Sequence, residues 1–268
     1  FRVVSSAANR EHDKFHILKH ISSDVKLTDV TEDYCCLGLF GPKSRTMISS
    51  ISSDDFSNEN FKFATAKLVM IDGLKVWAQR ISYVGELGFE LYVKKENALK
   101  LFDILMDKGK TYKISLCGMH AMDIMRMESG YLHWGHDISP EENQFEAGLN
   151  FAVSFKKNIN FIGRAALEKK RDKKDYKKFK MLILNSSKEG APLLLHDEPI
   201  YLNDKIVGRT TSGCYSFNYN KNLAFGYINS GLSSEQIDKQ AFEIEVEKKK
   251  YPAVVITRPL NDKKLNSL

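Results

Sequence analysis

The sequence predicts an α+β domain followed by a small all-β domain with the segment pattern of a barrel. Two observations lead to this fold class. Upstream of about residue 168, stretches with helical periodicity alternate with stretches in which every second residue is apolar. Beyond about residue 175, short β-like segments follow one another with turn residues between them. A lysine-rich run separates the two patterns, so we predict domains at residues 1–168 and 169–268.

Three upstream stretches place apolar residues at helical spacing. They are residues 11–21, 97–108 and 118–129. The second is amphipathic, with Leu101 and Leu105 on its apolar side. Gly130 follows the third, and glycine readily adopts the left-handed conformation that ends many helices. We therefore predict that this helix ends at Gly130.

The same half contains strand signals. A short buried strand is predicted at 37–40, and it runs through Gly41-Pro42 into a helix at 44–51. Gly41-Pro42 is either a plain strand-to-helix junction or a site where the start of the helix binds an anion. The segment lacks the glycine-rich loop that binds nucleotide phosphates, which favours the plain junction. Asp72-Gly73, between apolar runs at 68–71 and 74–79, predicts a β-hairpin.

The C-terminal half is predicted to consist of short strands. Asn203-Asp204 and residues 218–222 supply turns between them. The predicted strands cover residues 181–184, 199–202, 206–207, 224–228, 242–246 and 253–256.

The composition is that of a globular chain with a basic bias. The 268 residues are 43% hydrophobic, and the formal net charge is +6. Eight lysines and arginines crowd between Lys169 and Lys180. Such a run is most often a solvated surface. It could also contact nucleic acid, although few aromatic residues are interleaved, or attract an anionic substrate such as a polyglutamylated folate.

The chain shows no sign of secretion or of a membrane span. Its four cysteines have no Cys-x-x-Cys spacing, which favours a reducing compartment. There is neither a run of about 18 apolar residues nor a signal-like start. The chain begins without methionine, and residues 1–4 read as a strand already in progress, so we expect a fragment of a longer protein.

The strongest candidate site lies in residues 82–93. Phe89, Leu91 and Val93 alternate with Glu90, which places the carboxylate on the face opposite the apolar set. Gly85 and Gly88 allow a tight turn before the strand, and Tyr83 lies across that turn. The hypothesis is a pocket for an aromatic heterocycle, packed by Tyr83 and bound at its edge by Glu90. Taken alone, a glutamate on the outer face of an edge strand is usually just a solvated residue.

Two other clusters resemble chemical sites. His120, Asp123, Arg126 and Glu128 lie on the helix at 118–129, where Asp123 and Arg126 have the i,i+3 spacing of a structural ion pair.

A second cluster follows in the next loop. His133, His136 and Asp137 supply metal-ligand types, but Trp134 and Gly135 between them favour an ordinary loop. We predict no metal site.

Several motifs, in order along the chain, resemble the aminomethyltransferase (glycine cleavage T protein) superfamily. Residues 82–93 are similar to its signature, while 84–88 and 131–134 look closest to the folate-binding half of sarcosine and dimethylglycine dehydrogenases. Met122 departs from free T proteins, which carry a folate-contacting arginine there. The further motifs are GPKSR at 41–45, DIMRMESG at 123–130, WGHDI at 134–138, EAGL at 146–149, FIGRAAL at 161–167, VGRTTSG at 207–213 and AFGYI at 224–228.

The resemblance implies an aminomethyltransferase-like folate-binding domain and a C-terminal β-barrel. Tyr83 and Glu90 match the family's folate-binding tyrosine and glutamate. The implied cofactor is tetrahydrofolate, which captures a one-carbon unit from an oxidised N-methyl amine as 5,10-methylenetetrahydrofolate. FAD and the amine substrate are expected on a flavin domain of the same longer polypeptide, since this chain has no Gly-x-Gly-x-x-Gly. The family's catalytic aspartate lies upstream, so the catalytic residue here is unknown.

Other functions remain open. The chain could be a non-catalytic regulatory subunit resembling the pyruvate dehydrogenase phosphatase regulatory protein, or a free aminomethyltransferase. The lysine run leaves an RNA-associated role as a third class, although we expect no nucleic-acid or membrane partner. The expected compartment is the cytoplasm, or the mitochondrial matrix in a eukaryote.

Overall fold

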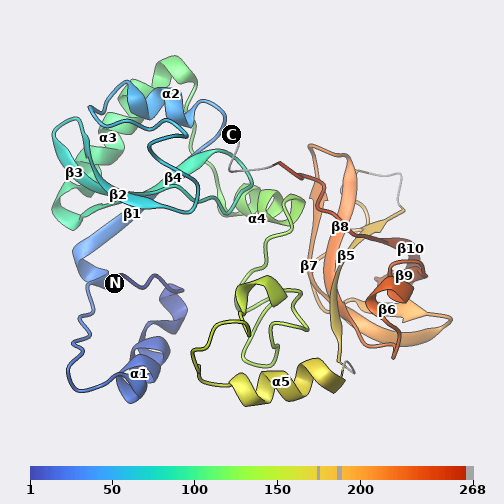
Figure 1. Cartoon of the computed structure of the whole chain (residues 1–268). Coiled ribbons are helices and arrows are strands. Elements are labelled where there is room, and N and C mark those ends of the chain that lie inside the picture. The colour runs from blue at the N-terminus through green and yellow to red at the C-terminus, as the bar shows by residue number, and fades with distance from the viewer. Residues whose placement is uncertain (174–175, 186–188, 264–268) are drawn as a thin grey trace. The chain divides into compact units, whose positions relative to one another are not determined.

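The computed structural model describes residues 1–173, 176–185 and 189–263. For Lys173 it describes the backbone only. Lys174, a member of the lysine-rich run, lies outside the described residues. The chain divides into two compact units (Figure 1). The first unit holds Phe1–Ser82 and Glu86–Leu116, and the second unit holds Tyr83–Gly85 and Cys117–Lys263.

The first unit is built on a four-stranded antiparallel sheet. Its strands are β1 (Tyr34–Phe40), β2 (Ala66–Ile71), β3 (Leu74–Gln79) and β4 (Gly88–Lys94), in the order β1-β4-β3-β2. The strand predicted at 37–40 and both predicted hairpin strands are therefore confirmed. β4 lies between two neighbours, so Glu90 is not on an edge strand.

The hairpin between β2 and β3 has the turn that its sequence predicts. Asp72 and Gly73 have positive φ angles of 44° and 79°. Positive φ at both central residues matches the right-handed twist of the flanking strands, and Asp-Gly adopts it at little cost. This turn fixes the register in which Ile71 faces Leu74.

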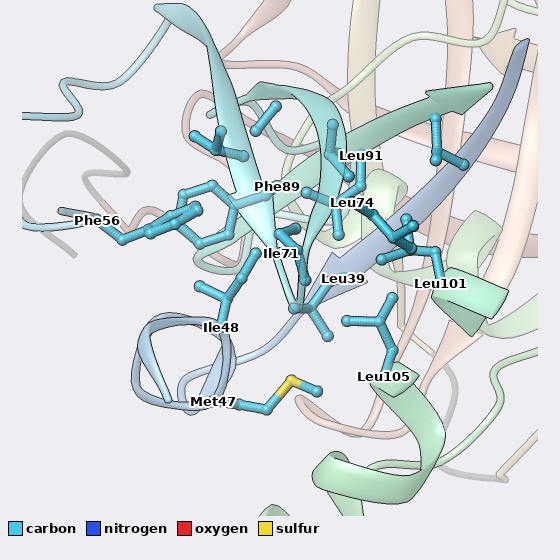
Figure 2. Packing of buried hydrophobic residues seen from close by; sticks show 14 of the residues in the cluster. Leu39, Met47, Ile48, Phe56, Ile71, Leu74, Phe89, Leu91, Leu101 and Leu105 are labelled. Carbon is cyan, nitrogen blue, oxygen red and sulfur yellow. The ribbon is translucent and has the colours of Figure 1, made fainter. Parts of the chain in front are cut away.

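One face of this sheet forms the core of the first unit. Phe89, Leu91 and Val93 on β4 are fully buried, as the two-residue alternation predicts. Two helices, α2 (Ser44–Ser49) and α3 (Ala98–Gly109), supply side chains to the same cluster. The residues packed there include Leu39, Met47, Ile48, Phe56, Ile71, Leu74, Leu101 and Leu105 (Figure 2).

The N-terminal segment precedes the sheet. It contains α1 (Arg10–His20), which has no buried residue. The helix predicted at 11–21 is confirmed. Residues 1–4 are not a strand, because none of the described strands pairs with them, so that prediction was wrong. The short 3-10 helices of the first unit are Ala7–Asn9, Thr31–Asp33, Lys95–Asn97 and Lys110–Tyr112.

The second unit contains a closed antiparallel barrel with the strand order β10-β5-β8-β7-β6-β9. The predicted all-β barrel is confirmed. β8 is buried along nearly its whole length, because its residues alternate between the barrel interior and a second apolar cluster around Met127 and Phe225. The strands are β5 (Lys178–Leu184), β6 (Pro199–Leu202), β7 (Lys205–Ser216), β8 (Lys221–Ile228), β9 (Ala241–Val246) and β10 (Lys249–Ile256).

Helices accompany the barrel in this unit. They are α4 (Met119–Glu128), α5 (Arg164–Lys173), the single-turn α6 (Ser234–Ile237) and the 3-10 helix Asn150–Ala152. Gly130 follows α4 with φ of 75°, which confirms the predicted helix end. Within the described part of the chain, no helix combines the length and apolar character needed to cross a membrane.

Candidate functional site

Glu90 lies on β4, on the face of the sheet opposite the core. Its register partners are Gly38 on β1 and Gln79 on β3. Gly38 has no side chain, and the Phe40 ring fills the space over it, because a Cβ on Gly38 would lie 2.6 Å from Phe40 Cε2. Glu90 is half-buried, so its carboxylate is partly removed from water.

Tyr92, two residues along the same strand face, holds Glu90. Its hydroxyl donates a hydrogen bond of 2.6 Å to Glu90 Oε2. Burial and then this bond raise the pKa of Tyr92, so the phenol stays a donor at neutral pH. Within the described part of the chain, no hydrogen bond to the other carboxylate oxygen of Glu90 is present.

A cavity of about 290 Å³ lies within the first unit. Tyr34, Cys36 and Tyr92 form its sheet side, and residues of the N-terminal segment such as Ser5 and Arg10 form the rest. Glu90 itself does not line this cavity, but the residue that holds it does. Burial raises the pKa of the Cys36 thiol to about 11, so Cys36 is not a thiolate nucleophile.

Tyr83 belongs to the second unit. Its hydroxyl donates a hydrogen bond of 3.1 Å to the Leu132 carbonyl, and its ring is stacked near Tyr131 with the centroids 6.3 Å apart. Burial raises the pKa of Tyr83. Glu90 lies in the first unit, so the joint pocket of Tyr83 and Glu90 stays a prediction.

Gly85, which precedes β4, and Gly88, the first residue of β4, have different roles. Gly85 has φ of 69°, and a Cβ there would lie 1.9 Å from Ser129 Oγ, so both the turn and the close approach require glycine. Gly88 does not have a positive φ. It pairs with Phe40, and a Cβ would lie 2.1 Å from the Phe40 ring, so the close packing of β1 on β4 requires glycine there.

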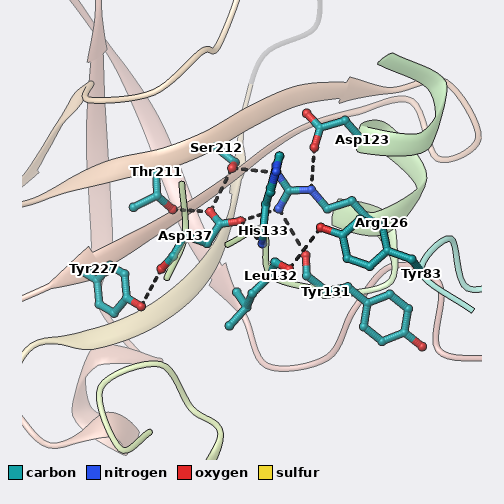
Figure 3. A network of polar contacts seen from close by, with 10 residues as sticks. All are labelled: Tyr83, Asp123, Arg126, Tyr131, Leu132, His133, Asp137, Thr211, Ser212 and Tyr227. Carbon is teal, nitrogen blue, oxygen red and sulfur yellow. Dashed lines mark hydrogen bonds and ion pairs between the residues drawn. The ribbon is translucent and has the colours of Figure 1, made fainter. Parts of the chain in front are cut away.

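Arg126 on α4 is the centre of a buried polar network (Figure 3). The guanidinium donates to Asp123 Oδ1 at 2.6 Å, which confirms the predicted i,i+3 ion pair, and to Asp137 Oδ2 at 2.5 Å. It also donates to the Tyr131 carbonyl at 3.1 Å and to Ser212 Oγ at 2.8 Å. Arg126 is 1% exposed, so these bonds replace its hydration.

Asp137 is the fully buried counter-ion of Arg126. It accepts hydrogen bonds from Thr211 Oγ1 at 2.5 Å, from Ser212 Oγ at 2.9 Å and from the His133 backbone N–H at 2.9 Å. No sequence pattern predicts the Arg126–Asp137 pair, because the loop that joins these two residues has no fixed periodicity. Both carboxylate oxygens of Asp137 are thus engaged in holding the loop against the barrel.

The network also orders the segment on which Tyr83 docks. Arg126 binds the Tyr131 carbonyl and Tyr83 binds the next carbonyl, that of Leu132. Tyr83 is therefore anchored to a loop that a buried ion pair fixes.

The remaining candidates of α4 and its loop have structural or exposed positions. Glu128 is buried and accepts hydrogen bonds from Ser216 Oγ at 2.7 Å and Asn218 Nδ2 at 2.9 Å. His120 is exposed. The rings of His133 and His136 are stacked 4.4 Å apart, and burial lowers the pKa of His133.

The lysine-rich run is partly neutralised inside the second unit. Lys177 pairs with Glu142 at 2.5 Å, and Lys180 pairs with Asp238. Lys170 lies 3.7 Å from Glu146. A second cavity of about 600 Å³ lies beside Lys177 and Arg209, but Arg209 is likewise paired, with Asp197. These pairs reduce the positive charge available to RNA or to an anionic substrate.

Two family models match this chain. The model described as GCVT N-terminal domain matches residues 1–157, and the model described as Glycine cleavage T-protein C-terminal barrel domain matches residues 177–262. The domain boundary that we predicted near residue 168 lies between the two matches and remains a prediction.

Individual proteins are similar over most of the chain. Mitochondrial dimethylglycine dehydrogenase of Homo sapiens is 37% identical over 240 residues, which are 88% of this chain and 27% of that protein. The aminomethyltransferase of Listeria welshimeri serovar 6b is 32% identical over 257 residues, which are 96% of this chain and 68% of that protein. The chain thus spans about a quarter of the dehydrogenase.

A solved structure shares the fold. The crystal structure of the glycine cleavage system aminomethyltransferase T from Bartonella henselae matches with a TM-score of 0.79 and 20% identity. The match covers 95% of this chain and 66% of that protein.

Proposed function

Because this chain belongs to the aminomethyltransferase family of the glycine cleavage T protein, we propose that it binds tetrahydrofolate and takes part in one-carbon transfer. The family models that cover most of the chain confirm the resemblance predicted from its ordered motifs. The chain is an aminomethyltransferase-like domain followed by the family's barrel, related to dimethylglycine dehydrogenase and to free aminomethyltransferases.

The observation that supports folate binding best is the environment of Glu90. The aminopyrimidine edge of a pterin offers two parallel N–H donors, which a carboxylate can accept together. A carboxylate has about four lone-pair sites, so the bond from Tyr92 leaves Glu90 free to accept more. The half-buried position strengthens each such bond relative to water. The residues present therefore fit a pterin.

Tyr83 is the second residue that we propose for folate. Its hydroxyl is engaged with the Leu132 carbonyl, which leaves the ring as the part available for packing. An aromatic ring with an anchored hydroxyl offers a rigid apolar surface to a flat ligand.

The role proposed for the chain's own residues is binding and orientation. Tetrahydrofolate supplies the amine that takes up the one-carbon unit, and no described residue is assigned as the catalyst. We further propose that the one-carbon unit comes from an oxidised N-methyl amine, produced on an FAD-bearing domain of the same polypeptide. The 37% identity to a dimethylglycine dehydrogenase supports that assignment.

Calorimetric titration of the chain with tetrahydrofolate tests this proposal. Glu90→Gln should weaken binding about 10- to 150-fold, because it replaces a charged acceptor of paired hydrogen bonds with a neutral amide, which corresponds to about 1.5 to 3 kcal/mol. Glu96→Gln is the matched control, since Glu96 is an exposed glutamate that follows the same strand.

The titrations of wild type and the two variants have three outcomes that would count against the proposal. Equal affinity of wild type and Glu90→Gln removes Glu90 from the site. Absence of binding by wild type overturns folate binding by this chain. An equal loss in Glu96→Gln shows that the loss of affinity is not specific to Glu90.

A further inference from the structure

Tyr92 and Glu90 form a preorganised pair on one face of β4. Residues two apart on a strand point to the same side, and the Tyr92 hydroxyl lies 2.6 Å from Glu90 Oε2. That separation is typical of a hydrogen bond from a hydroxyl to an ionised carboxylate, which is about twice as strong as a neutral bond.

The bond restricts the one torsion of glutamate that is otherwise loose. The terminal torsion of Glu, between sp³ and sp² carbons, has broad and roughly two-fold preferences. Fixing Oε2 sets the plane of the carboxylate and directs Oε1 away from Tyr92. A ligand with two parallel donors requires a defined plane, so this orientation removes part of the ordering cost of binding.

Tyr92 is itself held by its neighbours. It lies directly opposite Cys36 on β1 and Trp77 on β3, and it is half-buried. Pairing with strands on both sides holds the backbone of Tyr92 in place, so the hydroxyl could leave Glu90 only by rotation of the side chain.

We propose that Tyr92 is a positioning residue for the ligand that Glu90 binds. The inference rests on the proposed function, because it takes Glu90 as the ligand-binding carboxylate. Tyr92 acts through Glu90 and does not need to touch the ligand.

A double-mutant cycle in the complete 268-residue chain tests this role, with tetrahydrofolate as the titrated probe. Tyr92→Phe, which removes one oxygen, should weaken binding about 5- to 20-fold. The same substitution in a Glu90→Gln background should change affinity less than twofold, since the carboxylate that Tyr92 orients is then absent. Tyr34→Phe is the control, because Tyr34 lines the same cavity but makes no hydrogen bond to Glu90 among the described residues.

The cycle separates this inference from the proposed function. If Glu90→Gln weakens binding but Tyr92→Phe does not, or if the two effects multiply fully, Tyr92 is not a positioning residue although folate binding stands. If Glu90→Gln has no effect or wild type does not bind, both fall. A thermal midpoint of Tyr92→Phe within about 2 °C of wild type shows that a loss of affinity is not a loss of folding.

Discussion

Replacing Arg126 with methionine is expected to lower the free energy of unfolding of the second unit by about 3 to 5 kcal/mol. Asp137 is fully buried, and the substitution removes its only cationic partner among the residues described. The three neutral donors that remain on Asp137 cannot replace a guanidinium at 2.5 Å. A buried carboxylate without a counter-ion destabilises the folded state far more than the intact pair stabilises it.

Chemical denaturation can measure this loss in one unit alone. The chain has two tryptophans, Trp77 in the first unit and Trp134 in the second. In a Trp77→Phe background, tryptophan fluorescence comes from Trp134 and reports the unfolding of the second unit. Separate reporters are needed because a chain of two units need not unfold in one step.

Two comparisons make the Arg126 result specific. Arg258→Met in the same unit should change stability by less than about 1 kcal/mol, because Arg258 is 3.9 Å from Asp262 and both are exposed. Adding Asp137→Asn to Arg126→Met should cost less than the sum of the two single changes. A loss in Arg126→Met no larger than in Arg258→Met would show that the pair is dispensable.

Replacing Phe89 with alanine is expected to lower the free energy of unfolding of the first unit by about 3 to 5 kcal/mol. The ring is 0% exposed and lies in an aromatic cluster, with centroids 5.1 Å from Phe56 and 5.5 Å from Phe61. Phe89 pairs with Leu39 on β1, and the next residue, Glu90, pairs with both β1 and β3, so the sheet backbone can move little into the cavity that alanine leaves. A Trp134→Phe background, with Trp77 as reporter, isolates this unit.

Surface and size controls accompany Phe89→Ala. Leu68→Ala on β2 should change stability by about 0.5 kcal/mol or less, because Leu68 is 56% exposed. Phe89→Leu keeps most of the volume and should be clearly milder than Phe89→Ala. Equal losses for Phe89→Ala and Leu68→Ala would contradict the core assignment.

Much of the fold could be predicted from local pattern. The hairpin at Asp72-Gly73, the amphipathic helix α3 and the alternation of β4 follow from turn chemistry and periodicity, which act over a few residues. The prediction of a strand at residues 1–4 was wrong because a strand does not depend on neighbouring residues alone. A strand needs a partner, and apolar β-branched residues by themselves do not supply one.

The candidate site was predicted unevenly. Alternation placed Glu90 opposite Phe89 and Leu91, which the structure confirms. It did not identify Tyr92 as the donor to Glu90, since pattern gives the face of a side chain but not its hydrogen bonds. The i,i+3 pair of Asp123 and Arg126 was predictable from helix geometry, whereas the bond from Arg126 to Asp137 was not.

The family, the order of the elements and the side of β4 on which Glu90 lies could all be predicted from the amino-acid sequence, because each depends on residue type and short-range spacing. Which buried charges meet depends instead on how the elements pack. Asp137 reaches Arg126, Thr211 and Ser212 because the barrel strand β7 packs on α4 and its loop. Asp137 and Ser212 are 75 positions apart, Arg126 and Ser212 are 86 apart, and only the packed fold removes the water that would otherwise solvate each charge separately.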